Sequence, residues 1–445
     1  MKMKIKKIVK FTVISIAAVM PFFVSASMVF AGPDDRDVML QIIHSPMLPA
    51  VMTVPKETGT LLLSDSPEYA TEDGVLYTDL MKGDCRVYFY HVNQMNGPRK
   101  IAVMAYNPSD KAAMIYVNRY QFSWPSDEYY RVGKELSLMY YEMVPTSNKI
   151  QVPPLSYAVI GQRINAVAIQ PEALYSGIVD MTLSDMMQIF TVIMPYDADP
   201  VNFVKKCRYL ESDAVKLRGS FHGMNRELGL VTPYLPSEGI RYITVADGRV
   251  DRFVKGKDII DNRNSENVGN YGVDYNINLK TKGKGKIHVY FNPQGGEYAG
   301  VVEMLYRNNC KLVEVPPAGV YSMGGNDADA MQYIDSFDAG TDVNIHLMPP
   351  GAANLPVRLI IVPDNTVQQF IDQVNADRLR QKQQQIVPKH ADVNESLTSG
   401  YKKKDKSEKD TVKTEHIDVQ IASAETSTSL TDKNTHAGES NTGIN

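Results

Sequence analysis

The residue types that most often perform catalysis or bind metals are scattered along this sequence. The histidines of its central region occur singly, at His44, His91, His222, His288 and His346. None lies two or four residues from another, which is the spacing that a metal site on one strand or helix requires. Ser322 has a glycine two residues after it but a valine two residues before it, so the nucleophile turn of hydrolases is not encoded. These patterns predict a protein that is not an enzyme and needs no cofactor.

One group of acidic residues is dense enough to consider calcium. It comprises Asp327, Asp329, Asp335, Asp338 and Asp342. Calcium prefers hard oxygen ligands from loops, but this spacing matches no EF-hand loop. A solvated loop is the favoured interpretation, and we predict no metal site.

The three cysteines, Cys85, Cys207 and Cys310, lie far apart in the sequence. Zinc and iron–sulfur sites need closely paired ligands, so this spacing excludes such a motif. We expect buried apolar cysteines, with one long-range disulfide as the alternative.

Two segments are candidates for a ligand surface. Trp124, Tyr129 and Tyr130 form an aromatic group of the kind that binds sugars or peptides, although core packing is the commoner fate of such rings. The second candidate is a run of alternating lysines, Lys280, Lys282, Lys284 and Lys286. These lysines would suit a polyanion such as a cell-wall polymer, and a solvated turn is the alternative.

The elements that must position these residues are strands. Between residues 61 and 363, short alternating runs are separated by Gly, Pro, Asn and Asp, which is typical of antiparallel sandwiches or barrels. We predict one hairpin from 86–92 and 101–106 and another from 271–279 and 287–291. The segment 181–190 could form one or two helical turns before the strand that follows it, and its structure is left open.

Three landmarks occur twice in the same order. Asn107-Pro108, Val152-Pro153-Pro154 and a strand ending at Pro195 recur as Asn292-Pro293, Val315-Pro316-Pro317 and a strand ending at Pro363. Strand punctuation of this kind also arises by chance. The shared order favours an all-β fold of two tandem antiparallel β-sandwich domains of the Ig-like type, at 61–198 and 205–363.

The two ends of the sequence differ from this central region. Residues 1–31 read as a signal peptide, with lysines, an apolar run and a small-residue cleavage site between Ala31 and Gly32. Cleavage after Ala26 and an uncleaved anchor are the alternatives. Residues 32–60 are predicted as a linker, 364–387 as a helix behind good N-cap residues, and 388–445 as a disordered tail poor in apolar residues. After cleavage we expect no transmembrane span.

Several segments resemble a known family. They are 63–68, 269–275, 282–285, 291–300 and 348–356. They are similar to secreted bacterial proteins labelled as containing a copper amine oxidase-like N-terminal domain, a non-catalytic stalk module of which this chain shows no copy. The resemblance implies an extracellular or envelope protein with no assigned activity. Asn270-Tyr271 is followed by Gly272 instead of the acidic residue of the oxidase motif, so neither copper nor oxidase activity follows.

The composition is that of a soluble protein, with 43% apolar residues and a net charge of −4, which argues against a nucleic-acid partner. The leading hypothesis is a secreted or cell-envelope protein with a structural or adhesive role. The alternatives are a carbohydrate- or wall-polymer-binding module, and an enzyme whose site the motifs do not reveal. Wall polymers or other envelope proteins are the expected partners.

We predict that the mature protein begins at Gly32, because Val29 and Ala31 occupy the two positions that signal peptidase reads. N-terminal sequencing of the protein from medium, wall and membrane fractions checks this. An intact Met1 in the membrane fraction would show an anchored protein instead.

Overall fold

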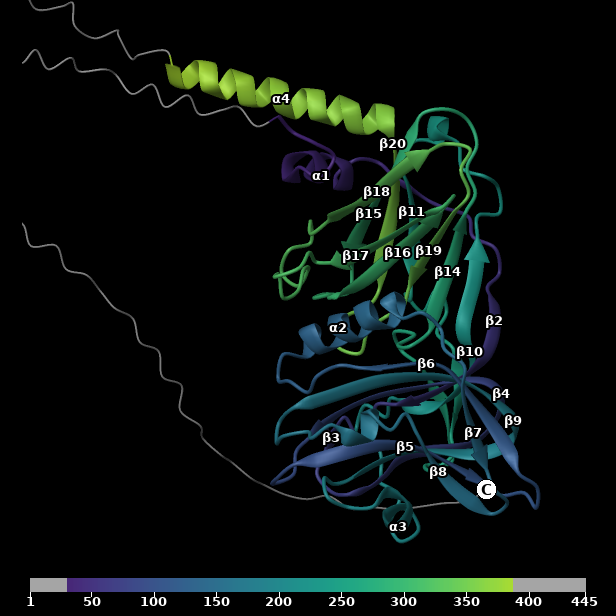
Figure 1. Ribbon diagram of the computed structural model, residues 1–445. Coiled ribbons are helices and arrows are strands. Elements are labelled where there is room, and N and C mark those ends of the chain that lie inside the picture. The colour runs from purple at the N-terminus through teal and green to yellow at the C-terminus, as the bar shows by residue number, and fades with distance from the viewer. Residues whose placement is uncertain (1–29, 387–445) are drawn as a thin grey trace, which may run out of the picture. The chain divides into compact units, whose positions relative to one another are not determined.

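Strands dominate the part of the chain that the computed structural model describes, residues 30–386 (Figure 1). The predicted mostly-β fold is therefore confirmed at this level. Most of the signal segment and the tail 388–445 lie outside the described residues. Within residues 30–386, no helix is both long and apolar enough to cross a membrane.

The first half of the fold contains two unusually long strands. Its strands are β2 (Lys56–Ser64), β3 (Tyr69–Ala70), β4 (Gly74–Asn93), β5 (Arg99–Asn107), β6 (Ala113–Phe122), β7 (Asn148–Val152), β8 (Ser156–Ile160) and β9 (Leu174–Pro195). Strands β4 and β9 pair antiparallel over nearly their whole length, with irregularities near Val75 and Met81. Beside them, the second part of β9 pairs with β5, whereas its first part pairs with β6. The long strands therefore run through two sheets.

The second half repeats this arrangement with shorter strands. They are β10 (Arg218–Gly229), β11 (Arg241–Val245), β12 (Lys255–Asp258), β13 (Arg263–Glu266), β14 (Asp274–Leu279), β15 (Lys286–Pro293), β16 (Gly300–Tyr306), β17 (Asn309–Val315), β18 (Gln332–Asp338), β19 (Val343–Leu347) and β20 (Val357–Pro363). The order β11-β20-β15-β18 corresponds to β4-β9-β5-β8, and β14-β19-β16-β17 corresponds to β4-β9-β6-β7. β1 (Leu48–Pro49) adds to the edge at β11.

Each half thus has the strand order of a jelly roll, with two facing four-stranded sheets. The prediction of an Ig-like order is wrong, because an Ig sandwich does not pass its strands alternately between the sheets in this way. Both halves lie in one compact unit, so the boundaries 61–198 and 205–363 stay predictions.

Both predicted hairpins are wrong for the same reason. β5 pairs with β8 and β9 but not with β4, and β14 and β15 belong to different sheets. In a jelly roll this connection crosses from one sheet to the other. Alternating residues mark a half-buried strand but do not identify its neighbour. The open segment 181–190 is part of strand β9.

The two rolls are joined by β2 and β10. These strands pair antiparallel, with Leu61 opposite Phe221, so that one continuous sheet runs through both rolls. Helix α2 (Tyr129–Glu142) contacts β6 and β9 of the first roll and β16 and β17 of the second (Figure 1). The sequence did not predict this helix, whose residues 129–142 include part of the Tyr-rich segment.

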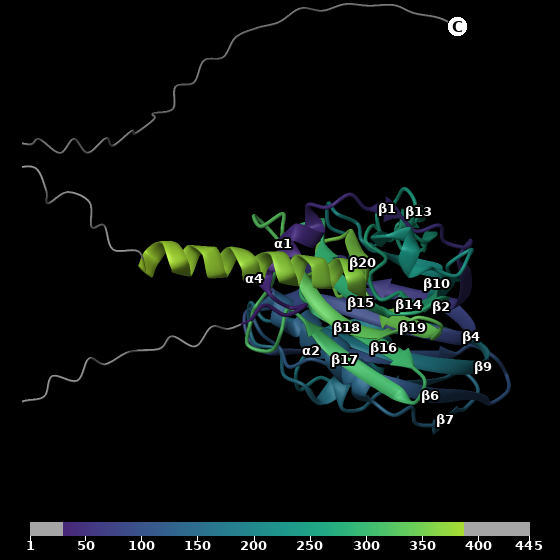
Figure 2. The same cartoon turned by 90° about the horizontal axis from the view of Figure 1, so that it is seen from above.

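The segment 32–60, which the sequence predicts as a linker, has regular elements in the structure. It contains helix α1 (Arg36–Ile43) and strand β1, and β2 already begins at Lys56. Helix α3 (Pro200–Val204) follows β9, and helix α4 (Asp364–Ile386) confirms the predicted C-terminal helix. α1 packs beside α4, as Figure 2 shows, and Arg378 of α4 pairs with Asp35 at 2.9 Å. The predicted cleavage position lies here: the Ala31 N–H donates to the Asn375 side chain.

Candidate functional site

A cavity of about 310 Å³ lies where the two rolls meet. The first roll contributes the β2–β3 loop and β4, α2 contributes its first turn, and the second roll contributes the segments before β10 and β14 and the β19–β20 loop. The acidic and phenolic residues of its wall are Asp65, Glu68, Tyr90, Tyr129, Tyr130 and Tyr271. Val215, Leu217, Gly351, Ala352 and Asn354 complete it. Cavities at domain interfaces with aromatic walls and a few polar groups are typical ligand sites.

Two carboxyl groups give the cavity its chemical character. Asp65 is only 8% exposed, and its Oδ1 has no hydrogen-bond partner among the described residues. Burial, followed by the nearby charges of Glu68 and Asp213, raises the pKa of Asp65 well above its ordinary value. Burial and Asp213 also raise the pKa of Glu68. These groups therefore lack a compensating cation.

The loop that carries both acids is fixed from within the first roll. Ser64 Oγ lies 2.8 Å from His91 Nε2, and His91 Nδ1 lies 2.8 Å from the Pro67 carbonyl. The carbonyl can only accept, so Nδ1 carries the hydrogen and Nε2 accepts from Ser64. Burial lowers the pKa of His91 to about 4, which keeps the ring neutral. Ser64 and His91 resemble a nucleophile and its base, but both are fully buried and positioned as loop supports.

Asp213, which precedes β10, also holds this loop in place. Its carboxylate accepts from Ser66 Oγ at 2.9 Å and from the Glu68 N–H at 2.8 Å. Burial alone would raise the pKa of Asp213, but these and neighbouring backbone hydrogen bonds lower it overall. Asp213 is therefore a structural carboxylate that orients the loop.

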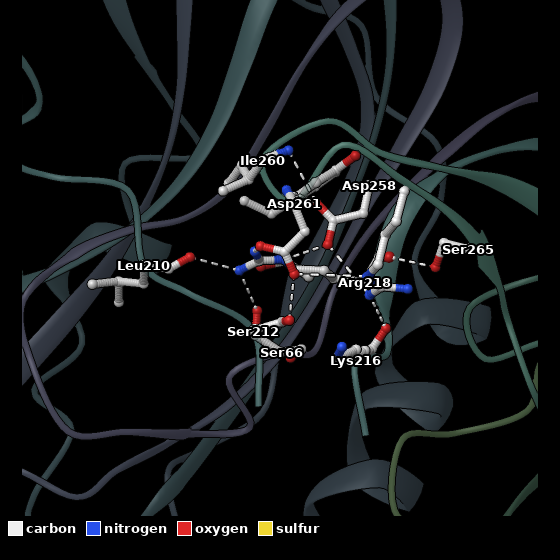
Figure 3. A network of polar contacts seen from close by, with 12 residues as sticks. Ser66, Leu210, Ser212, Lys216, Arg218, Asp258, Ile260, Asp261 and Ser265 are labelled. Carbon is white, nitrogen blue, oxygen red and sulfur yellow. Dashed lines mark hydrogen bonds and ion pairs between the residues drawn. The ribbon is translucent and has the colours of Figure 1, made fainter. Parts of the chain in front are cut away.

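Behind the loop lies Arg218, the first residue of β10 (Figure 3). Its guanidinium is fully buried and donates to Asp258 at 2.9 Å and to Asp261 at 2.8 Å. The same group donates to the carbonyls of Ser66, Leu76 and Leu210 at 2.9 to 3.1 Å. One side chain of the second roll thus fixes three backbone positions that belong to or flank the first roll.

The aromatic side of the cavity is packed closely onto the β19–β20 loop. Gly351 lies so near Tyr90 that an added Cβ would come within 2.2 Å of the ring, so this position requires glycine. Tyr271 donates its hydroxyl to the Ala353 carbonyl at 3.0 Å. The Asn354 amide donates to the Tyr130 hydroxyl at 3.3 Å. Burial raises the pKa of the Tyr90, Tyr129 and Tyr271 phenols, which keeps them protonated as donors.

The structure separates the aromatic residues that the sequence grouped together. Tyr129 and Tyr130 line the cavity, whereas Trp124 lies outside its wall and is 66% exposed. The Trp124 ring packs edge-on against Phe122. The turn from β6 into α2 causes this separation, because the two tyrosines belong to the helix and Trp124 precedes it.

The four lysines of the second candidate surface are brought near neither the tyrosines nor the cavity wall. All four are exposed: Lys280, Lys282 and Lys284 lie on the connection between β14 and β15, and Lys286 is the first residue of β15. The backbone of Lys282 pairs with Tyr234, on the second roll. A role for these lysines in binding stays a prediction.

Sequence reasoning missed Asp65, Glu68, Tyr271 and Asn354 as site residues. All four lie in segments that carried the family resemblance, namely 63–68, 269–275 and 348–356. These segments are far apart in the sequence and meet only because the rolls are joined. The available signal was that all of these segments resemble the same family. That resemblance did not indicate that the segments contact one another.

The other candidate groups are placed apart from the cavity. Within residues 30–386, no group of three or more His, Cys, Asp or Glu is arranged to hold a metal ion. Asp329 pairs with His44, and Asp335 pairs with Lys311. The three cysteines are free: Cys85 is buried, as expected, but Cys310 is exposed.

Comparisons with known proteins identify no family for this chain. No protein-family model and no curated protein matches it. A 7S globulin of Momordica charantia is 9% identical, covering 66% of this chain and 80% of that protein, with a TM-score of 0.11. A vicilin from Capsicum annuum is 8% identical over 65% of this chain and 75% of that protein, also with a TM-score of 0.11. At these TM-scores the likeness supports no conclusion about fold or function.

We predict that Arg218→Met destabilises the protein by about 3–5 kcal/mol, because it breaks the fully buried ion pair with Asp258 and leaves only the partly exposed Arg263, 3.3 Å away, as a cation for that carboxylate. Urea unfolding of the mature chain measures the loss. Arg307→Met is the matched control, since its pair with Asp338 is exposed and is worth less than about 1 kcal/mol. Equal effects of the two substitutions would contradict a central role for Arg218.

We predict that Asp65→Asn stabilises the protein increasingly as the pH rises above about 4, the ordinary pKa of an aspartate. The pKa of Asp65 is raised in the folded state, so this state binds more protons than the unfolded state between the two pKa values. Stability is then lost as the pH rises through that window, and the substitution removes this loss. Urea unfolding across the pH range measures the effect, with exposed Asp110→Asn as control. If the difference in the free energy of unfolding between the variant and the original protein does not depend on pH, the result would contradict the burial of an ionisable Asp65.

Proposed function

We propose that the mature chain is an exported, non-catalytic protein of the cell envelope that adheres to a carbohydrate polymer through the cavity between its two rolls. The observation that carries this proposal is the combination of tyrosines and carboxyl groups around one cavity of about 310 Å³. Aromatic rings offer flat apolar faces to sugar rings, and carboxyl and amide groups accept or donate hydrogen bonds to hydroxyls. A second cavity, lined by Asp73, Asp199 and Phe203 among others, has carboxyl groups but no tyrosine in its wall.

The fold supports a binding role more directly than a purely structural one. A jelly roll is a scaffold used by lectins among other proteins, although a fold does not by itself determine function. The cavity wall is rigid, because the acid loop is held by His91, Asp213 and Arg218. A preformed wall avoids the entropy cost of ordering a loop when ligand binds.

Export and the envelope location rest on the sequence. The N-terminal segment has the order of a signal peptide, with lysines, an apolar run and a small-residue cleavage site. A structural role in the envelope is compatible with binding, because a protein that holds a polymer also crosslinks or retains it. We also propose that the two rolls arose by duplication, supported by the shared strand order and the three repeated landmarks.

The proposed lack of catalysis is supported by the position of the groups that resemble catalytic ones. Ser64 and His91 are fully buried behind the wall and have no route to a ligand. Asp65 and Glu68 do reach the cavity, and a pair of carboxyls is the apparatus of glycosidases. Cleavage of a bound glycan by the purified protein would therefore overturn this part of the proposal.

We predict that Tyr129→Ala with Tyr130→Ala weakens binding to an immobilised glycan by about tenfold or more, because both rings of the cavity wall are lost. Calorimetry or retention on glycan columns measures the change. Trp124→Ala is the matched aromatic control and leaves the affinity unchanged, since its ring lies outside the wall.

The lysines provide the second comparison. Lys282→Ala with Lys284→Ala tests the polyanion surface that the sequence predicted, and the cavity proposal expects no change in glycan affinity from it. If substitution of Trp124 or of these lysines abolishes binding and substitution of the two tyrosines does not, the binding site lies on the exposed surface and not in the cavity.

A further inference from the structure

The charges around the cavity are unbalanced. Its wall contains two carboxyl groups and four phenols, but none of its residues is Lys, Arg or His. Asp213, a third carboxylate, lies directly behind the loop. Buried charges in proteins are normally paired, so an unpaired acidic wall is costly unless a ligand supplies the missing cation.

The buried cation that contacts this loop, Arg218, does not supply the missing charge. Arg218 donates to the Ser66 carbonyl beside Asp65, but its charge is already paired with Asp258 and Asp261. Asp65 Oδ1 meanwhile has no donor within the described part of the chain, although Asp65 is only 8% exposed. A buried carboxylate oxygen without a donor is an empty acceptor position on the cavity wall.

We propose that Asp65, assisted by Glu68, forms a subsite for an ammonium group, and that the carbohydrate polymer recognised by this protein contains amino sugars with free amines. This inference rests on the proposed function, because it takes the cavity to be the carbohydrate site. An ammonium group carries three donors and one positive charge. A sugar hydroxyl supplies a donor but no charge and would leave the acids uncompensated.

The aromatic wall fits the same group. Tyr90, Tyr129 and Tyr271 surround the acids, and an ammonium is attracted to the face of a phenol ring, more strongly where water is excluded. A metal ion fits less well, because within residues 30–386 no three His, Cys, Asp or Glu side chains are arranged to hold one. The arrangement thus favours an organic cation with an apolar body.

The protonation of the acids is consistent with this role. Burial and like charges raise the pKa of Asp65 and of Glu68, and a bound ammonium would reverse that effect. Binding then involves no covalent step. A proton that leaves Asp65 passes to solvent, and the positive charge of the ligand replaces it.

The experiment compares three β-1,4-linked tetrasaccharides by calorimetry, made of glucosamine, N-acetylglucosamine or glucose. They differ only in having an ammonium, an acetamide or a hydroxyl at the second carbon. With the amine protonated, we expect the glucosamine oligomer to bind the full mature chain at least about tenfold more tightly than the other two. Asp65→Asn should reduce this ratio to near one, whereas Asp110→Asn should preserve it.

The variant is suited to the purpose because Asp65→Asn keeps the size of the side chain and removes an uncompensated charge. The measured quantity is a ratio between ligands, so a general loss of folding would lower all three affinities and leave the ratio unchanged. Retention of the preference in correctly folded Asp65→Asn protein would overturn the assignment to Asp65.

The remaining outcomes separate the two proposals. Equal binding of all three sugars would overturn the ammonium subsite and leave carbohydrate binding intact. If no sugar binds but 1,5-diaminopentane does, and Asp65→Asn abolishes this, the subsite stands and the carbohydrate function falls. If neither the sugars nor the diamine bind, both proposals are overturned.

Discussion

The buried guanidinium of Arg218 is the interaction on which the arrangement of this protein depends. It lies at the start of β10, where the continuous sheet passes from one roll to the other, and it pairs there with Asp258. A buried ion pair adds little stability by itself, since desolvation cancels most of the attraction. Its value here is geometric: the planar guanidinium fixes the carbonyls of Ser66, Leu76 and Leu210 in one position, and separation of the rolls would leave the Ser66 and Leu76 carbonyls without this donor.

The cavity follows from that joint. Arg218 holds the Ser66 backbone while Asp213 and His91 hold its neighbours, so Asp65 and Glu68 have little freedom to turn toward water. The second roll closes the opposite wall because its β19–β20 connection is a loop, whereas in the first roll the corresponding strands merge into β9. The two rolls differ at this connection, and the candidate site lies there.

The sequence predicts which segments form strands better than it predicts which strands pair with one another. Alternation identified strands correctly along the chain, and the order of Asn-Pro, Val-Pro-Pro and strand-Pro landmarks corresponds to strands that occupy matching places in the two rolls. Both hairpin predictions failed at the connection from β4 to β5 and from β14 to β15, where a jelly roll changes sheets. Strands adjacent in the sequence were assumed to pair. The alternation of apolar residues, however, determines only which face of a strand is buried and does not identify the neighbouring strand.

The site was harder to predict than the fold because its chemistry is produced by burial. Tyr129 and Tyr130 could be proposed from their types, whereas Asp65 and Glu68 in 63–68 resemble any polar turn between strands. The second roll helps to remove them from water and places them beside Tyr271, about two hundred residues later. An ordinary turn would keep such carboxyls solvated at no cost. Their enclosure without a cation reduces stability, and a ligand that brings positive charge is the physical reason that would justify this cost.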